Sequence, residues 1–148
     1  MMGLPEGHVT SPEIGLARNE SDFVPDRIGP DGKDCGITQT RITVSRYRCE
    51  RLRRDVNLAF REAARELTEY RASCRGAGDF DRCRLNKYNS GYRYARSGWH
   101  GRYWLRVLCF AEAARAGVSP GEACRRVGSR EKVELLIARL RAPKVASR

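Results

Sequence analysis

Six hydrophobic residues at helical spacing place the strongest constraint on the fold of this sequence. They recur at steps of four and three residues, a spacing that brings them onto one face of an α-helix. The pattern predicts a long core helix over residues 51–75. The residues that form this face are Val56, Phe60, Ala63, Leu67, Tyr70 and Cys74.

Helices are also expected on both sides of this core helix. Ser11-Pro12-Glu13 is typical of a helix start, because a serine oxygen caps free amides, proline suits the first turn, and an acid favours the positive end of the helix dipole. This first helix is expected to end near Ser21. Two further helices are predicted over residues 81–88, closed by Asn89-Ser90-Gly91, and over residues 102–116.

The segment between the first helix and the core helix contains residues that interrupt regular structure. Pro25 and the run Gly29-Pro30-Asp31-Gly32 are typical of loops. The alternating residues 37–44 favour a short extended piece within a small hairpin. The predicted fold class is therefore mainly α, a helical domain with a small extended or β element.

The C-terminal region is predicted to add a helical hairpin. Ser119-Pro120-Gly121-Glu122 has the form of a capping box at the start of one helix, and Ser129 is placed to cap the last one. The apolar residues of the last helix are expected to point inward. They are Val133, Leu136, Ile137 and Leu140.

The length of 148 residues suits one domain with short extensions. Residues 1–10 are expected to form an N-terminal tail and residues 11–117 the helical domain. Residues 118–148 are expected to form a C-terminal helical extension with a basic tail. The sequence contains no internal repeat and no low-complexity tract.

The charge of the chain indicates a polyanionic partner. Lysine and arginine number 29 against 18 acidic residues, which gives a net charge of +11. Nucleic acid and the bacterial cell wall both meet that description. No apolar run approaches the roughly 18 to 20 residues that a membrane span needs, and residues 1–10 lack the profile of a signal peptide.

Six cysteines are many for a cytosolic protein, but their spacing does not predict a metal site. No C-x-x-C motif occurs, and only His8 and His100 are available to join them, so neither zinc nor any other cofactor is expected. Cys74 and Cys83 flank a glycine-rich loop that a disulfide would close in an oxidising place. Buried free thiols fit the same spacing.

Four polar patches occur in a fixed order: Asn19-Glu20-Ser21, the segment 34–39, Asp55-Val56-Asn57, and Tyr88-Asn89-Ser90-Gly91. In these patches the sequence resembles the catalytic domain of the soluble lytic transglycosylases, relatives of goose-type lysozyme. That family carries an E-S pair, a G-L-M-Q segment, an asparagine in the next long helix, and an A-Y-N-A-G segment. The resemblance covers residues 12–116 and implies a lysozyme-like fold.

The match is made residue by residue. Glu20-Ser21 stand for E-S, Gly36-Ile37-Thr38-Gln39 for G-L-M-Q, Asn57 for the helix asparagine, and Tyr88-Asn89-Ser90-Gly91 for Y-N-A-G. Thr38 replaces the usual methionine, and Gly29 stands where many relatives have a serine nine residues after the glutamate.

Glu20 is the predicted catalytic acid. Cleavage of a glycosidic bond needs a protonated acid beside the leaving oxygen, and burial keeps a carboxyl protonated near neutral pH. Glu20 is expected near a helix end, facing Phe23, Val24 and Ile37. The resemblance implies that this one glutamate first protonates the leaving oxygen and then deprotonates the 6-hydroxyl of the sugar, which attacks the anomeric carbon.

The resemblance also implies the other site residues. Tyr88 is expected close to the catalytic glutamate as a second catalytic residue, while Gln39 and Asn89 contact the N-acetyl sugars. The remaining substrate-binding residues in this prediction are Ser21, Gly36 and Thr38. Asn89 also fits a role as a helix end and Tyr88 as a core aromatic.

Two further groups of residues each fit two roles. Asp31 and Asp34 suit a role in holding a water molecule in a hydrolytic enzyme, and they also suit turn formation. An aromatic cluster offers stacking faces for sugar rings or side chains for the core. It consists of Tyr92, Tyr94, Trp99, Tyr103 and Trp104.

The predicted function is therefore a peptidoglycan lytic transglycosylase that cleaves the β-1,4 bond between N-acetylmuramic acid and N-acetylglucosamine and leaves a 1,6-anhydro end. The small basic chain without a signal peptide favours a wall-degrading component of a phage virion, or an enzyme released by a lysis or secretion machine, with other proteins of that assembly as partners. A hydrolytic lysozyme is the alternative on the same fold.

Two candidate functions from different classes are a structural virion protein and a basic nucleic-acid-binding protein. The nucleic-acid-binding protein would use the C-terminal hairpin as a helix-turn-helix. Its phosphate contacts would come from Arg125, Arg126, Arg130 and Arg139. Binding to nucleic acid does not explain the ordered patches, so nucleic acid is not the expected partner.

Overall fold

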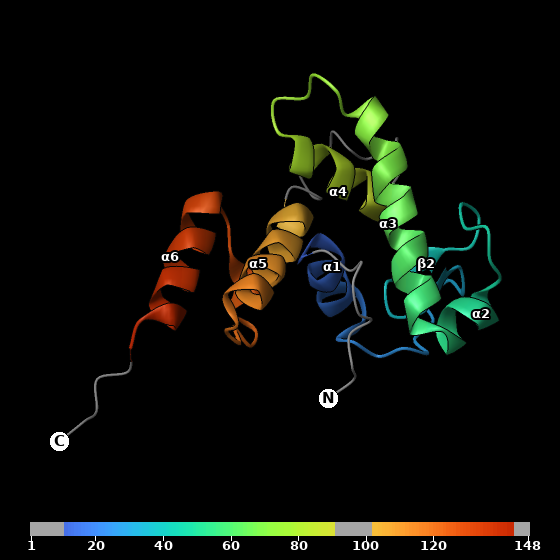
Figure 1. Cartoon of the computed structure of the whole chain (residues 1–148), viewed down its shortest axis with the longest axis horizontal. Coiled ribbons are helices and arrows are strands. Elements are labelled where there is room, and N and C mark those ends of the chain that lie inside the picture. The colour runs from blue at the N-terminus through green and yellow to red at the C-terminus, as the bar shows by residue number, and fades with distance from the viewer. Residues whose placement is uncertain (1–10, 91–101, 144–148) are drawn as a thin grey trace.

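The computed structural model describes residues 11–90 and 102–143, and this part of the chain is mainly helical (Figure 1). The mainly α class predicted from the sequence is confirmed. The helices are α1 (Ser11–Ser21), α2 (Cys49–Arg54), α3 (Val56–Ser73), α4 (Phe80–Ser90), α5 (Tyr103–Ala116) and α6 (Arg130–Arg141), with the 3₁₀ helix η2 (Ala123–Arg126) and the strands β1 (Asp34–Cys35) and β2 (Thr40–Arg41).

Helix α1 lies at the centre of the molecule, between α5 and α3, and α6 lies on the far side of α5 (Figure 1). Gly15 lets the backbones of α1 and α5 touch. A Cβ atom at Gly15 would lie 2.2 Å from the carbonyl oxygen of Val107 and 2.8 Å from the amide nitrogen of Ala111. No side chain fits there, so this contact fixes α1 against α5.

Two clusters of buried side chains form the core, and α1 contributes to both. Leu16 packs into the cluster built mainly from α5 and α6, whereas Ala17 packs into the cluster around Phe60 of α3. Both residues are fully buried. The C-terminal end of α1 is therefore held from two sides.

The prediction of one long core helix over residues 51–75 is wrong, because this segment forms two helices, α2 and α3. Asp55 separates α2 from α3 with extended backbone angles, φ −119° and ψ 96°, and its carboxylate accepts a hydrogen bond from the Leu58 amide. An aspartate in this position caps the new helix more favourably than it would continue the old one. The predicted apolar face of α3 is confirmed at Phe60, Ala63 and Leu67, which are buried.

The small hairpin is confirmed, and β2 lies within the residues 37–44 that were expected to be extended, whereas β1 precedes them. β1 pairs antiparallel with β2, so that Cys35 lies opposite Thr40. Residues 37–39, also expected to be extended, form part of the connecting turn instead. Gly36 has a φ of +81°, and a Cβ there would lie 2.7 Å from the Leu52 carbonyl oxygen, so the close approach of α2 requires glycine.

Over its described residues, 118–143, the C-terminal extension contains one regular α-helix, α6, rather than a helical hairpin. The predicted capping box is wrong, because no side chain caps the short η2 and the Glu122 carboxylate instead binds the side chain of Arg125 at 2.9 Å. The predicted cap of α6 is confirmed, since Ser129 accepts a hydrogen bond from the Lys132 amide. Val133 of α6 is buried against the core.

All six cysteines form disulfides, and of the two alternatives left open for Cys74 and Cys83 the structure has the bridge rather than free thiols. The other two bridges bind the hairpin to α2 and η2 to α5. They are Cys35–Cys49 and Cys109–Cys124. Each closes a short loop and stabilises the fold mainly by restricting the unfolded chain.

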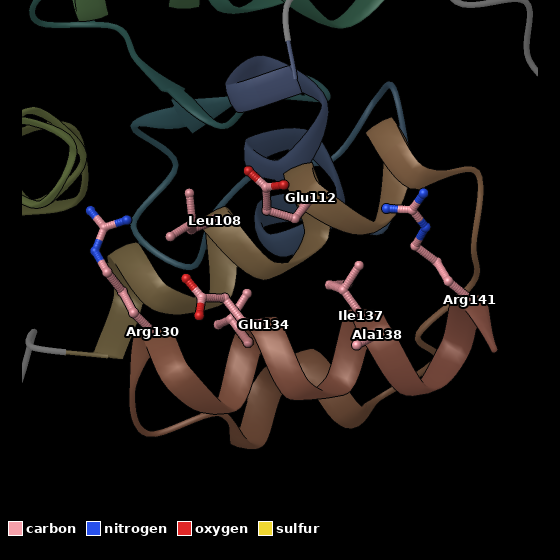
Figure 2. Close-up of a pocket in the computed structure, with 8 residues that line it drawn as sticks. Leu108, Glu112, Arg130, Glu134, Ile137, Ala138 and Arg141 are labelled. Atoms are coloured by element: carbon pink, nitrogen blue, oxygen red, sulfur yellow. The ribbon is translucent and has the colours of Figure 1, made fainter.

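A cavity of about 330 Å³ lies between α5 and α6. Figure 2 shows Leu108 and Glu112 of α5 across from Glu134 and Ile137 of α6. Apolar and charged side chains line this cavity, and Glu20 is not one of them. Within residues 11–90 and 102–143, no helix has the length and apolar character needed to cross a bilayer.

Candidate active site

Glu20 lies in the last turn of α1, partly buried against the first turn of α5. The hydroxyl group of Tyr103 donates a hydrogen bond to Glu20 Oε1. Tyr103 is only 3% exposed, whereas Glu20 is partly buried, so the bond is partly shielded from solvent. Gly15, where α1 contacts α5, lies just over one helical turn before Glu20. This contact fixes the separation of the Glu20 carboxyl and the Tyr103 hydroxyl.

The surroundings of Glu20 keep its carboxyl protonated near neutral pH. The pKa of Glu20 is raised from 4.5 to about 7, mainly by burial and to a lesser extent by the negative charge of Asp34, against the lowering effects of the hydrogen bond from Tyr103 and the charges of Arg106 and Arg27. Burial outweighs the stabilising contacts. A carboxyl that titrates near 7 can both donate and accept a proton at neutral pH, as general acid–base catalysis requires.

Ser21 ties the end of α1 to the hairpin turn. Its side chain is fully buried, and its hydroxyl donates to the Ile37 carbonyl oxygen at 2.6 Å, with the Ala17 carbonyl oxygen at 3.1 Å. The hydroxyl is thus committed to the backbone. Ser21, predicted as a substrate-binding residue, holds Glu20 in place from the adjacent position.

Tyr88 lies on α4 and supports the same turn. Its hydroxyl donates to the Thr38 carbonyl oxygen at 2.9 Å and lies 3.2 Å from Thr40 Oγ1. Burial raises the pKa of Tyr88, and the charges of Glu66 and Glu20 raise it further. Tyr88 therefore lies within the electrostatic reach of Glu20, but the hydroxyl that bonds to Glu20 comes from Tyr103.

The other predicted substrate-binding residues divide into buried and accessible groups. Gly36 and Thr38 are buried, and Thr38 Oγ1 lies 2.9 Å from Thr40 Oγ1. Gln39 is partly exposed, and its amide donates to the carbonyl oxygens of Arg27 and Gly36, both at 2.9 Å. Asn89 is exposed near the end of α4.

Asn57 and Trp104 were candidate site residues, but one is exposed to solvent and the other lies in the core. Asn57, matched to the helix asparagine of the lytic transglycosylases, is exposed in the first turn of α3. Trp104 belongs to the buried core. Tyr92, Tyr94 and Trp99 of the predicted aromatic cluster fall outside the described residues, as does Gly91 at the end of the Tyr88 motif.

The sequence reasoning named Tyr103 only as a member of the aromatic cluster and missed its bond to Glu20, and it did not single out Glu66. Burial raises the pKa of Glu66 to about 7, and the Tyr70 hydroxyl donates to Glu66 Oε1 at 2.7 Å. The sequence contains a signal for Glu66, because it follows Ala63 by three residues and precedes Tyr70 by four on the predicted core face. Tyr103 has no such signal, since its bond to Glu20 depends on how α1 packs against α5.

Asp34 is the acid that acts most directly on Glu20, whereas Asp31 is part of the loop. Arg41 binds both carboxylates, Asp31 at 3.2 Å and Asp34 at 3.1 Å. Burial raises the pKa of Asp34, while a hydrogen bond from the Lys33 amide lowers the pKa of exposed Asp31.

Two of the four arginines proposed to bind phosphates are used within the protein. Arg130 pairs with Asp79 at 2.9 Å, and its guanidinium lies 4.9 Å from the centre of the Trp104 ring. Arg125 pairs with Asp22 at 2.8 Å. These ion pairs hold the C-terminal extension against α4 and α1.

The comparison of this chain with protein-family models, curated proteins and solved structures gave no match. In the part of the chain that the structure describes, no group of histidine, cysteine, aspartate and glutamate side chains is arranged to hold a metal ion. The chemistry of the site is therefore argued from its own residues.

Proposed function

We propose that this protein is a peptidoglycan lytic transglycosylase with a lysozyme-like fold and that Glu20 is its single catalytic acid and base. The observation that carries this proposal is the partly buried Glu20 carboxyl, whose pKa is raised to about 7 and which accepts a hydrogen bond from the Tyr103 hydroxyl. It lies at the end of a helix that precedes the small β-hairpin, and the turn of that hairpin carries Gln39. This arrangement suits an acid that acts beside a bound sugar.

In the proposed reaction, protonated Glu20 gives its proton to the oxygen between N-acetylmuramic acid and N-acetylglucosamine, and the bond from that oxygen to the anomeric carbon breaks. The 6-hydroxyl oxygen of the same muramic residue then bonds to the anomeric carbon, and the Glu20 carboxylate takes its proton. The products are a 1,6-anhydro-muramic end and a free 4-hydroxyl. An intramolecular hydroxyl reaches an effective molarity of about 10⁵ M or more when well placed, which favours it over water.

The surrounding residues have distinct proposed roles. Tyr103 stabilises the carboxylate that forms after the first proton transfer, because its hydroxyl donates to Glu20. Asn89 is proposed to contact the N-acetyl sugars through its amide, since amides match the donors and acceptors of sugars. Gln39 is proposed to contact them through its side-chain oxygen, because its nitrogen already donates to two backbone carbonyl oxygens. Tyr88 supports the hairpin turn that carries Gln39, and Ser21 ties the end of α1, where Glu20 lies, to the same turn.

A hydrolytic lysozyme is the second candidate, and Asp34 favours it. The Asp34 charge acts on Glu20, and its carboxylate is held by Arg41. A second carboxylate near the acid can activate a water molecule, as in inverting glycosidases.

The proposed place of action is the bacterial cell wall, with delivery by a virion or a lysis or secretion machine. Three disulfides support it, because disulfides persist in oxidising places such as the periplasm. The net charge of +11 supports binding to a polyanionic wall. Nucleic acid is the less favoured partner, because Arg125 and Arg130 already bind acids of this chain.

Mass spectrometry of muropeptides from purified sacculi tests the proposal. After incubation with the protein, the expected products carry 1,6-anhydro-muramic ends. Reducing muramic ends would instead identify the hydrolytic lysozyme. Sacculi that remain intact under oxidising conditions would refute both enzymatic functions.

A further inference from the structure

The chain turns sharply directly after the Glu20-Ser21 pair. Asp22 and Phe23 both have positive φ angles, 52° and 61°. For residues other than glycine this conformation costs of order 1–2 kcal/mol each, so surrounding contacts must hold it in place. The direction in which α1 presents Glu20 depends on this turn.

Arg125 of η2 binds the residues on both sides of the Glu20-Ser21 pair. Its Nη2 donates to Asp22 Oδ1 at 2.8 Å. Its Nη1 lies 3.5 Å from both the carbonyl oxygen and the side-chain oxygen of Asn19. One guanidinium therefore spans the end of α1, from the residue before the acid to the first residue of the turn.

The guanidinium of Arg125 is itself fixed. Its Nε donates to Glu122 at 2.9 Å, and its central carbon lies 5.4 Å from the centre of the Phe110 ring. Arg18 lies 4.9 Å from the same ring and binds the same Asp22 carboxylate. Two cations on one aromatic ring thus hold a single aspartate.

The Cys109–Cys124 disulfide fixes the backbone next to Arg125. Cys124 is fully buried and covalently joined to α5, the helix that also carries Tyr103. Arg125 and Tyr103, the two side chains that contact the end of α1, are therefore both anchored to α5.

We propose that Arg125 is a positioning residue for the general acid, which holds the left-handed turn at Asp22 and so fixes the direction of the Glu20 carboxyl. The catalytic consequence rests on the proposed function, whereas the geometry does not. The C-terminal extension then belongs to the active site, because it supplies the group that orients the acid.

The direction in which the pKa of Glu20 shifts when Arg125 is lost distinguishes two mechanisms. If the turn loosens, water reaches Glu20 and its pKa falls from about 7 toward the ordinary value of 4.5. If only the positive charge mattered, its removal would raise the pKa instead. The titratable and charged groups that act on Glu20 from the neighbouring elements stay in place, and they are Tyr103, Arg106, Asp34, Arg27 and Tyr88.

An NMR titration of the ¹³C-labelled carboxyl of Glu20 tests this proposal without any need for activity. Arg125→Ala should lower the pKa of Glu20 by about one unit or more, and Arg125→Lys should lower it less, because an ammonium keeps the charge but cannot span Asn19 and Asp22. Arg126→Ala is the matched control, since Arg126 is the exposed neighbouring arginine, and should leave the pKa unchanged. An unchanged or raised pKa in Arg125→Ala would overturn the proposal. If that variant does not fold, a wild-type pKa in Arg125→Lys overturns it.

The activity readout links the proposal to catalysis. Above the pKa, one unit of lowering reduces the protonated fraction about tenfold. For Arg125→Ala we expect kcat at pH 8 to fall about tenfold at similar KM, with the alkaline limb of the rate profile moved to lower pH. Arg126→Ala should retain the wild-type profile. A wild-type protein that does not cut sacculi refutes the proposed function, while the NMR result still decides the role of Arg125.

Discussion

Tyr103→Phe should raise the pKa of Glu20. The hydroxyl of Tyr103 donates to the Glu20 carboxyl in a buried setting and stabilises its charged form. A hydrogen bond to a charged group contributes about 1.5–3 kcal/mol, and one pKa unit corresponds to about 1.4 kcal/mol. Removing the hydroxyl should therefore raise the pKa from about 7 by roughly one to two units.

The measurement is a titration of the Glu20 carboxyl by ¹³C NMR in the wild type and the variant, with thermal unfolding as a check on the fold. Tyr70→Phe is the matched control, because it removes a hydroxyl that donates to a different carboxyl with a raised pKa, Glu66, at 2.7 Å. That control should leave the pKa of Glu20 in place. The alkaline limb of the lysis rate should move to higher pH in Tyr103→Phe alone. A pKa of Glu20 that stays constant or falls on loss of the Tyr103 hydroxyl refutes the reasoning.

Three further predictions concern stability. The pKa of Glu66 is raised from 4.5 to about 7 in the folded protein, so the stability that this carboxyl contributes is present below pH 4.5 and lost as the pH rises through 7. In denaturant unfolding, Glu66→Gln should therefore stabilise the protein by up to about 3 kcal/mol at pH 8 and not at pH 4, and equal effects at the two pH values would contradict this. Gly15→Ala should lower the unfolding free energy by about 2–3 kcal/mol, because its Cβ would meet the α5 backbone. Gly128→Ala is the control and should change stability little, because a Cβ there meets nothing within 4 Å; equal melting temperatures for the two variants would show that α1 does not pack this closely. Reduction should add two hydrogens per disulfide to the intact mass and lower the unfolding free energy by about 3 kcal/mol per bridge, and an unchanged mass would mean free thiols.

The sequence predicted those parts of the fold that depend on local patterns. The apolar spacing of Phe60, Ala63 and Leu67 identified the buried face of α3, and Ser129 identified the start of α6. The break at Asp55 escaped this reasoning, because a continuous apolar face is compatible with one helix and with two. The capping box at residues 119–122 failed because Glu122 binds Arg125, a side chain whose position follows from the tertiary fold.

The candidate site divides in the same way. Glu20 was predicted from a motif, and its buried environment is a property of the assembled helices. Tyr103 and Arg125 reach the end of α1 from 83 and about 105 positions further along the chain. Contacts over such separations leave no periodic trace in a single sequence, so their roles required the structure.

The central claim, that Glu20 is the catalytic acid and base, is tested most directly by Glu20→Gln acting on purified sacculi. Glutamine preserves size and hydrogen bonding but cannot transfer the proton. We predict that release of 1,6-anhydro-muropeptides slows by about 10² to 10⁴-fold or more, while circular dichroism and binding to sacculi stay the same. Near-normal lysis by a folded Glu20→Gln protein would contradict the account.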